Sequence, residues 1–185
     1  MKQNPSGPQI FMNSTIVLCA LAAAACFFFY YGGRTERDLV LWIGIVCTMI
    51  VYHFWLRLIF GNVTKLFKVD RNHWWFQERK FEKPLYQFLR VKAWKGRALT
   101  YRPQDFDLQT RSLSDIATTM CKSEIDHWIN EAISVSSIFF ALLWGEWWIF
   151  LLTALCAMVF DGQFIVIQRY NRPRVLRILK KQEAM

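Results

Sequence analysis

The sequence predicts an all-α integral membrane protein with about four transmembrane helices in two hairpins and amphipathic interfacial helices between the hairpins. Of its 185 residues 54% are hydrophobic, including 16 Phe and 9 Trp, which is too apolar for a soluble domain of this length. Four apolar runs approach the length of about 20 residues that a spanning helix needs. The formal charge is +9, and most of the Lys and Arg residues lie outside these runs, which suits contact with anionic headgroups.

The first hairpin is formed by apolar runs at residues 15–32 and 39–60, joined by the short polar turn GRTERD. A signal peptide cleaved at Cys26 is the alternative for the first run. The residues that follow Cys26 are FFFYY rather than polar, and Lys2 is the only basic residue before the run. We therefore expect the first run to be retained as a membrane helix.

The segment of residues 62–123 is rich in basic and aromatic side chains, as in HWWFQERKFEKPLYQFLRVKAWKG. Its apolar residues recur at helical spacing, with a break expected near Pro84. A basic helix that carries Trp and Phe on one side suits the plane of the headgroups. The aromatic side chains could be membrane anchors or a substrate cage, and we favour anchors. Attachment between two hairpins argues against nucleic-acid binding.

The second hairpin is predicted from runs at about residues 128–144 and 147–168, joined by Gly145 and Glu146. The helix that leads into it should begin at an N-cap, Ser112 or Ser114, after a loop-like linker at residues 101–110. The chain thus divides into an N-terminal hairpin (1–61), a cytoplasmic or interfacial segment (62–123) and a C-terminal hairpin with a basic tail (124–185).

Lysine and arginine residues are concentrated after the second and fourth apolar runs, whereas the two hairpin turns carry only Arg34 and Arg37. Because cytoplasmic loops carry the excess of positive charge, both turns should lie outside. The middle segment and both termini should then be cytoplasmic.

The five cysteines show no C-x-x-C spacing, and four of them lie inside apolar runs. They are therefore interpreted as small hydrophobic residues rather than as disulfide partners or zinc ligands. No motif of a metal or cofactor site is evident, so we expect neither a metal nor a cofactor.

Several polar residues fall near the predicted cytoplasmic boundary of the apolar runs, where ionisable groups suggest function. Glu124 and His127 lie three apart on one helix face, so a carboxylate could orient an imidazole that acts as a general base. An interfacial histidine beside a solvated glutamate is the alternative. His53 is a second candidate base, or a hydrogen-bonded bundle residue.

Asp161 lies within the last turns of the fourth run. An unpaired carboxylate there would cost several kcal/mol. We expect it to pair with Arg57, Arg169 or another cation.

The fourth run ends in QRYNRPRV, residues 168–175. Arginine presents a planar fork suited to phosphate or carboxylate, and Asn and Tyr can hydrogen-bond hydroxyl groups. Pro173 should end the helix and hold Arg172 extended. Arginines in this position can also be simple topology anchors.

Three segments, VIQRYNRPRVLRILKK, VKAWKGRAL and SEIDHWI, resemble the glycosyl-4,4'-diaponeurosporenoate acyltransferases, small membrane enzymes of bacterial carotenoid biosynthesis. The resemblance covers roughly residues 75 to 181. Asp161 replaces the asparagine expected near the end of the last span. The resemblance implies transfer of a fatty acyl group to a sugar hydroxyl of a glycosylated carotenoid or another glycolipid, in a bacterial cell membrane.

Together, the residues and the resemblance predict direct acyl transfer from acyl-CoA or acyl carrier protein, with His127 as general base and Glu124 as its orienting partner. The predicted substrate-binding residues, for donor phosphates, the thioester carbonyl or the acceptor, are His53, Trp94, Lys95, Asp161, Gln168, Arg169, Tyr170, Asn171, Arg172 and Arg174. The alternative is a non-catalytic membrane adaptor that binds anionic lipid or a partner enzyme. The sequence leaves open whether the chain forms a homo-oligomer.

Overall fold

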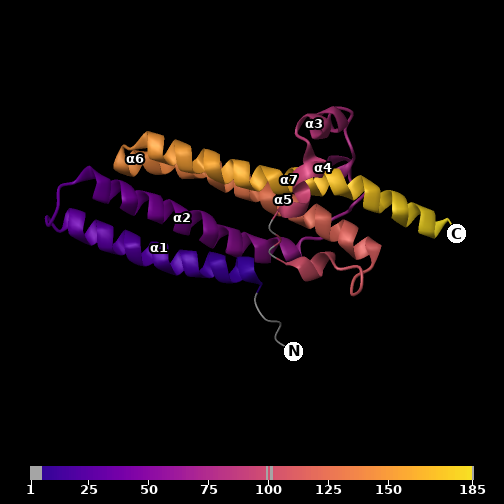
Figure 1. Cartoon of the computed structure of the whole chain (residues 1–185), viewed down its shortest axis with the longest axis horizontal. Coiled ribbons are helices and arrows are strands. Elements are labelled where there is room, and N and C mark those ends of the chain that lie inside the picture. Colours follow the sequence, from indigo (N-terminus) through magenta and orange to yellow (C-terminus); the bar gives the residue numbers. More distant parts are fainter. Residues whose placement is uncertain (1–5, 99, 101, 185) are drawn as a thin grey trace. The chain divides into compact units, whose positions relative to one another are not determined.

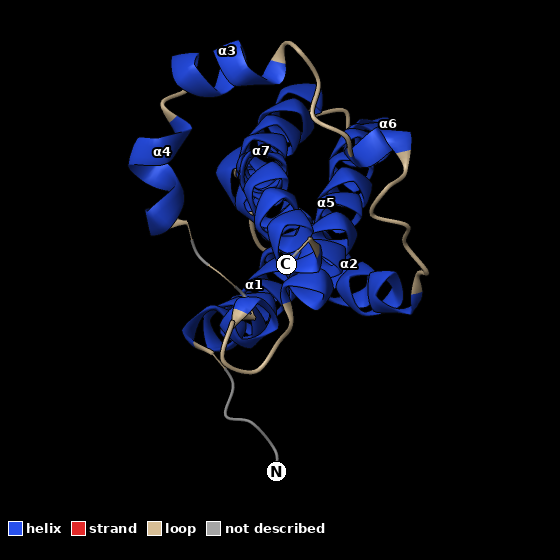
Figure 2. Cartoon of the chain, turned by 90° about the vertical axis from the view of Figure 1, so that its right-hand side faces the viewer, coloured by secondary structure: helices blue, strands red, loops and turns tan. Residues whose placement is uncertain are grey.

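A computed structural model describes residues 6–98, 100 and 102–184, and these residues form helices, turns and loops with no strand among them (Figures 1 and 2). The long helices are α1 (Gly7–Tyr31), α2 (Asp38–Val63), α5 (Leu113–Ser136) and α7 (Trp147–Glu183). The short helices are α3 (Glu82–Phe88), α4 (Val91–Trp94) and α6 (Ala141–Trp144). Two 3-10 turns lie between α2 and α3, two between α4 and α5, and one between α5 and α6. The all-α prediction is confirmed.

Within the described residues, three helices are long and apolar enough to cross a membrane: Gly7–Tyr31, Asp38–Leu66 and Trp147–Glu183. They contain most or all of the first, second and fourth predicted runs. The third predicted run is divided among the end of α5, a 3-10 turn at Ser137–Phe140, and α6. The count of four spans therefore stays a prediction.

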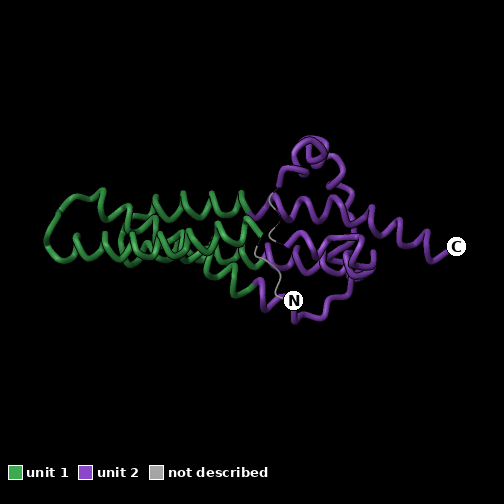
Figure 3. The backbone as a smooth tube through the Cα atoms, turned by 60° about the horizontal axis from the view of Figure 1, so that its bottom comes forward, with its two compact units in different colours: residues 1–60, 129–160 green, residues 61–128, 161–185 purple. Residues whose placement is uncertain are grey.

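The chain forms two compact units (Figure 3). The first, unit 1, consists of residues 1–60 and 129–160, and the second, unit 2, of residues 61–128 and 161–185. The three-part division predicted from the sequence describes attachment to the membrane and stays a prediction.

The core of unit 1 is a cluster of apolar side chains from α2 and α7. Leu41, Ile45 and Met49 recur every four residues on one face of α2 and pack with Ile149 and Phe150 of α7. A Cβ atom at Gly44 would lie 3.1 Å from the Cys26 Cβ, so the glycine permits the close approach of α1 and α2.

The N-terminus of α5 is capped as the sequence predicts. The Ser112 hydroxyl oxygen accepts a hydrogen bond from the Asp115 backbone N–H at 3.1 Å, which selects Ser112 over Ser114 as the cap. Arg71 instead donates a hydrogen bond to the Ser114 hydroxyl.

The middle segment forms short helices rather than one amphipathic helix. Pro84 lies in the first turn of α3. Backbone N–H groups in a first turn have no intrahelical acceptor, so the proline costs the helix no hydrogen bond. The expected break accordingly falls just before α3. A second interruption is at Arg90, whose φ of 49° separates α3 from α4.

The prediction that Pro173 ends the last helix is wrong, because α7 continues through Pro173 to Glu183. Proline removes the N–H that would donate to the Arg169 carbonyl, and it strains the turn before it. Arg169 and Arg172, both just before Pro173 on α7, make several tertiary contacts. These contacts hold the helix through the proline.

Candidate active site

The site lies within unit 2, where α5 and α7 run antiparallel. His127 pairs with Asp161, Ser123 with Gln168, and Glu124 with Arg172. From the pair of His127 and Asp161 to the pairs of residues 123–124 with 168–172, residue numbers fall along α5 and rise along α7, as antiparallel packing requires. One face of each helix therefore supplies the polar side chains of the site.

The imidazole of His127 is held by a buried carboxylate. Its Nδ1 lies 2.8 Å from Oδ1 of Asp161, whose side chain is 0% exposed while that of His127 is 17% exposed. The Phe164 ring stacks on the imidazole, with 4.7 Å between the ring centroids. With Nδ1–H donated to the carboxylate, Nε2 is the ring nitrogen that can take up a proton.

This geometry corrects one expectation. The carboxylate that contacts the imidazole of His127 belongs to Asp161 and not to Glu124. Glu124 instead accepts hydrogen bonds from two arginines of α7, at 2.6 Å from Arg169 and 2.5 Å from Arg172.

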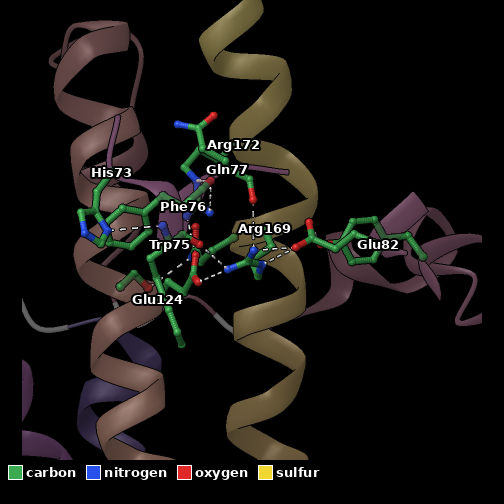
Figure 4. A network of polar contacts seen from close by, with 11 residues as sticks. His73, Trp75, Phe76, Gln77, Glu82, Glu124, Arg169 and Arg172 are labelled. Carbon is green, nitrogen blue, oxygen red and sulfur yellow. Dashed lines mark hydrogen bonds and ion pairs between the residues drawn. The ribbon is translucent and has the colours of Figure 1, made fainter. Parts of the chain in front are cut away.

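Glu82, Glu124, Arg169 and Arg172 form a buried ion network (Figure 4). Arg169 bridges the two carboxylates, at 2.5 Å from Glu82 and 2.6 Å from Glu124. Glu124 is 0% exposed and Arg172 is 1% exposed. With two negative and two positive groups the network is neutral, which limits the cost of removing its charges from water.

The same arginines fix the segment before α3. Arg172 donates to the Phe76 carbonyl oxygen at 3.2 Å from Nε and 2.8 Å from Nη2. Arg169 donates to the carbonyl oxygens of Trp75 and Gln77, as Figure 4 shows. Because Arg172 is buried and engaged in this way, its geometry is that of a structural clamp. The sequence suggested that Arg172 contacts the substrate directly. Such a contact would require Arg172 to give up its hydrogen bonds to Glu124 and to the Phe76 carbonyl.

Lys95, Tyr170, Asn171 and Arg174 form a second group, which we name the cationic cradle. The Lys95 ammonium donates to Oδ1 of Asn171 at 2.6 Å and lies 4.9 Å from the centroid of the Tyr170 ring. The Arg174 guanidinium carbon lies 4.1 Å from the same centroid, and Nη2 donates to the Tyr170 hydroxyl at 2.7 Å. Two cations thus share one aromatic ring.

Tyr86 connects the cradle to the buried ion network. Its hydroxyl donates to Oε2 of Glu82 at 2.9 Å, and its ring packs edge-on against Tyr170, with 5.5 Å between centroids. Burial and the neighbouring Glu82 carboxylate raise the pKa of the Tyr86 hydroxyl. Tyr86 therefore stays protonated and remains a donor at neutral pH.

The other predicted residues lie elsewhere or serve packing. Trp94 donates its indole N–H to the Leu89 carbonyl at 2.9 Å and so secures the turn between α3 and α4. Gln168 donates to Ser123 at 3.2 Å. His53 belongs to unit 1, where it is buried and packs edge-on against the Tyr52 ring.

Sequence reasoning missed Glu82 and Tyr86, and it set Asp126 aside because Asp126 points away from the helix face of Glu124 and His127. Glu82 and Tyr86 lie one turn apart on α3, but a glutamate inside a basic stretch is typical of a solvated surface. Burial raises the pKa of the Asp126 carboxyl. The charge of His127 lowers this pKa, whereas the charge of Asp161 raises it further. Among the described residues no group of three or more His, Cys, Asp and Glu side chains could hold a metal ion.

A protein-family model described as CrtO, glycosyl-4,4'-diaponeurosporenoate acyltransferase, matches residues 72–181. The chain belongs to this family. It is therefore an acyltransferase of carotenoid biosynthesis, which acylates a glycosyl carotenoid. The resemblance found in the sequence motifs is confirmed, and the matched residues include His127, Asp161, the buried ion network and the cationic cradle. No curated protein and no solved structure matches the chain.

Proposed function

We propose that the acyltransferase moves a fatty acyl group from a thioester, acyl-CoA or acyl carrier protein, directly to a sugar hydroxyl of a glycosyl carotenoid. His127 is the general base and Asp161 its orienting partner. The observation that carries this assignment is the 2.8 Å contact between His127 Nδ1 and the fully buried Asp161 carboxylate. Such a contact fixes both the tautomer and the orientation of an imidazole.

In the reaction, Nε2 of His127 accepts the hydroxyl proton as the sugar oxygen attacks the thioester carbonyl carbon. The Asp161 carboxylate stabilises the imidazolium that forms. The tetrahedral intermediate then collapses, the C–S bond breaks, and the departing thiolate takes the proton from the imidazolium. The products are the ester and a free thiol, and His127 returns to its neutral form.

A cysteine nucleophile is not needed for this scheme. Cys121 is buried in unit 2, and burial raises the pKa of its thiol to about 11. At neutral pH the thiol is therefore almost entirely protonated, whereas the thiolate is the nucleophilic form. Direct transfer is accordingly favoured over an acyl-enzyme intermediate.

The buried ion network has a positioning role in this proposal. Glu124 lies three residues before His127 on α5 and is held by Arg169 and Arg172 of α7. These bonds fix the register of α5 against α7, and this register brings His127 to Asp161. We further propose a bacterial cell membrane location with both termini cytoplasmic, where soluble thioester donors are found.

The test is lipid analysis by mass spectrometry of cells that supply the glycosyl carotenoid and express the wild type, His127→Ala or His73→Ala at matched levels. His73 is an exposed histidine of the same unit and serves as the control. We expect a fatty acyl mass on the glycosyl carotenoid with the wild type and His73→Ala, and none with His127→Ala. Loss of a general base lowers kcat by about 10²–10⁴-fold. Undiminished acylation by His127→Ala would overturn the assignment of the base while leaving the family activity intact.

A further inference from the structure

We propose that the cationic cradle of Lys95, Tyr170, Asn171 and Arg174 binds a phosphate of the acyl donor, the phosphate that links the pantetheine arm in both coenzyme A and acyl carrier protein. This inference rests on the proposed thioester donor. It assigns donor recognition to the half-buried Lys95 and to Arg174, an exposed cation of the tail, and withdraws it from Arg169 and Arg172.

The first argument is charge balance. Arg169 and Arg172 each pair with a carboxylate in the buried ion network. Over the part of the chain that the structure describes, no ion pair includes Lys95 or Arg174. The cradle therefore carries two positive charges without a carboxylate to offset them.

The second argument is the mutual approach of these charges. Burial lowers the pKa of the Lys95 ammonium, and the nearby Arg174 guanidinium lowers it further. Two cations held around one tyrosine ring repel each other. A phosphate bound between them would offset this repulsion, and would accept hydrogen bonds from the arginine fork and from the ammonium.

The third argument is pre-organisation. The side-chain oxygen of Asn171 accepts a hydrogen bond from the Lys95 ammonium. The amide N–H groups of Asn171 can therefore donate hydrogen bonds to a phosphate oxygen. The Tyr170 ring is braced by Tyr86, which is bonded to Glu82 of the buried ion network. Donor groups fixed in this way lose little conformational entropy on binding. A long flexible pantetheine arm allows the phosphate to bind away from the reacting thioester carbon.

A lipid headgroup carries the same phosphate chemistry, so the experiment must distinguish the two sources. We would measure equilibrium binding of coenzyme A and of dephospho-coenzyme A to the purified full-length chain in nanodiscs, with neutral phosphatidylcholine or with added phosphatidylglycerol. The variants are Lys95→Ala, Arg174→Ala and the control Arg177→Ala. Arg177 is an exposed cation three residues further along α7, bonded to the Pro173 carbonyl.

We expect Lys95→Ala and Arg174→Ala each to raise the Kd of both ligands about tenfold in neutral nanodiscs, because each removes charge-assisted hydrogen bonds. Arg177→Ala should leave both Kd values unchanged. Lys95→Arg should restore binding in large part, which separates loss of charge from misfolding.

Unchanged binding in both alanine variants overturns the proposal. So does a loss confined to coenzyme A, which would place its 3′-phosphate in the cradle. A lipid headgroup would be identified as the occupant instead if the variants bind coenzyme A with the wild-type Kd in neutral nanodiscs, and if added phosphatidylglycerol changes this Kd for the wild type but not for the variants. Since binding is measured without turnover, the result is independent of whether His127 is the general base.

Discussion

Asp161 and Glu124 are both fully buried carboxylates in unit 2, yet they have different partners and therefore different roles. Asp161 contacts an imidazole that is partly open to solvent, and Glu124 contacts two guanidinium groups. A carboxylate on an accessible imidazole can serve proton transfer, whereas a carboxylate between arginines serves register and stability. At the residue scale, the partner of each carboxylate decides its function.

Asp161→Asn should lower kcat by on the order of 10²-fold or more, with little change in KM for the acceptor. The amide cannot stabilise the imidazolium and can favour the wrong tautomer. Steady-state kinetics of the purified enzyme would show this, with Asp105→Asn as control, since the half-buried Asp105 pairs with Arg111. A raised KM at unchanged kcat would contradict the orienting role.

Arg172→Met should lower the free energy of unfolding by about 3–5 kcal/mol, since it leaves the buried Glu124 with one cation fewer. Adding Glu124→Gln to this variant should recover part of the loss. Chemical unfolding in detergent would measure both, with the exposed Arg177→Met as control. Equal losses for Arg172→Met and Arg177→Met would contradict the clamp role of Arg172.

Asp126→Asn should stabilise the protein more at pH 8 than at pH 4. Burial raises the pKa of Asp126 above its usual value of 3.8, an effect that Asp161 reinforces and His127, Thr64 and Lys65 oppose. The folded state thus holds this proton more tightly than the unfolded state. The stability of the wild type therefore falls as pH rises through the interval between the two pKa values. Melting temperatures of both proteins across this range would test the sign, and a difference that does not depend on pH would contradict it.

At the scale of elements, α7 combines two tasks in one helix. Its N-terminal part supplies Ile149 and Phe150 to the core of unit 1, and its C-terminal part supplies Asp161, Arg169 and Arg172 to the site of unit 2. Helix continuity through Pro173 keeps Tyr170 and Arg174 one turn apart on one face, as the cationic cradle requires.

Pro173→Ala should raise the free energy of unfolding by about 1–3 kcal/mol, because alanine restores an N–H donor inside a helix. Pro103 begins a 3-10 turn, where its missing N–H costs little, so Pro103→Ala is the matched control. Thermal unfolding in detergent would compare the two variants. Destabilisation by Pro173→Ala would instead indicate that the local distortion at proline is part of the native packing.

At the scale of the whole molecule, the number of spans determines on which side the ends of the chain lie. In the part of the chain that the structure describes, three helices are long and apolar enough to cross a membrane. Residues 128–144 form a fourth predicted span, although α5, a 3-10 turn and α6 share them. An even number of crossings puts both termini on one side, and an odd number puts them on opposite sides.

Reporter fusions at the N- and C-termini should both report the cytoplasm, as four spans and the distribution of Lys and Arg predict. A pair of reporters active on opposite sides would show that the broken third segment does not cross. A cysteine substituted at Gly145 should be labelled from outside in the four-span topology, and Gly33→Cys provides the matched position in the first turn.

Much of the architecture can be read from the sequence. Apolar run lengths predict four spans, and three of these runs correspond to long apolar helices. The cap candidates Ser112 and Ser114 predict the start of α5, and the tail motif predicts the family. These features depend on composition and on neighbours along the chain. His127 could be chosen as a candidate base from the sequence as well. An ionisable group at the edge of an apolar segment costs free energy and therefore suggests a function.

The partners of these groups were decided by tertiary structure alone. Glu124 lies three residues before His127 on the same helix face, but the antiparallel register of α5 and α7 brings Asp161 to the imidazole and two arginines to Glu124. The same register buries Arg172 and leaves Arg174 exposed, although only Pro173 separates them in sequence. Sequence patterns fix the face of a helix on which a side chain lies, whereas the charge that meets it depends on how the two helices pack.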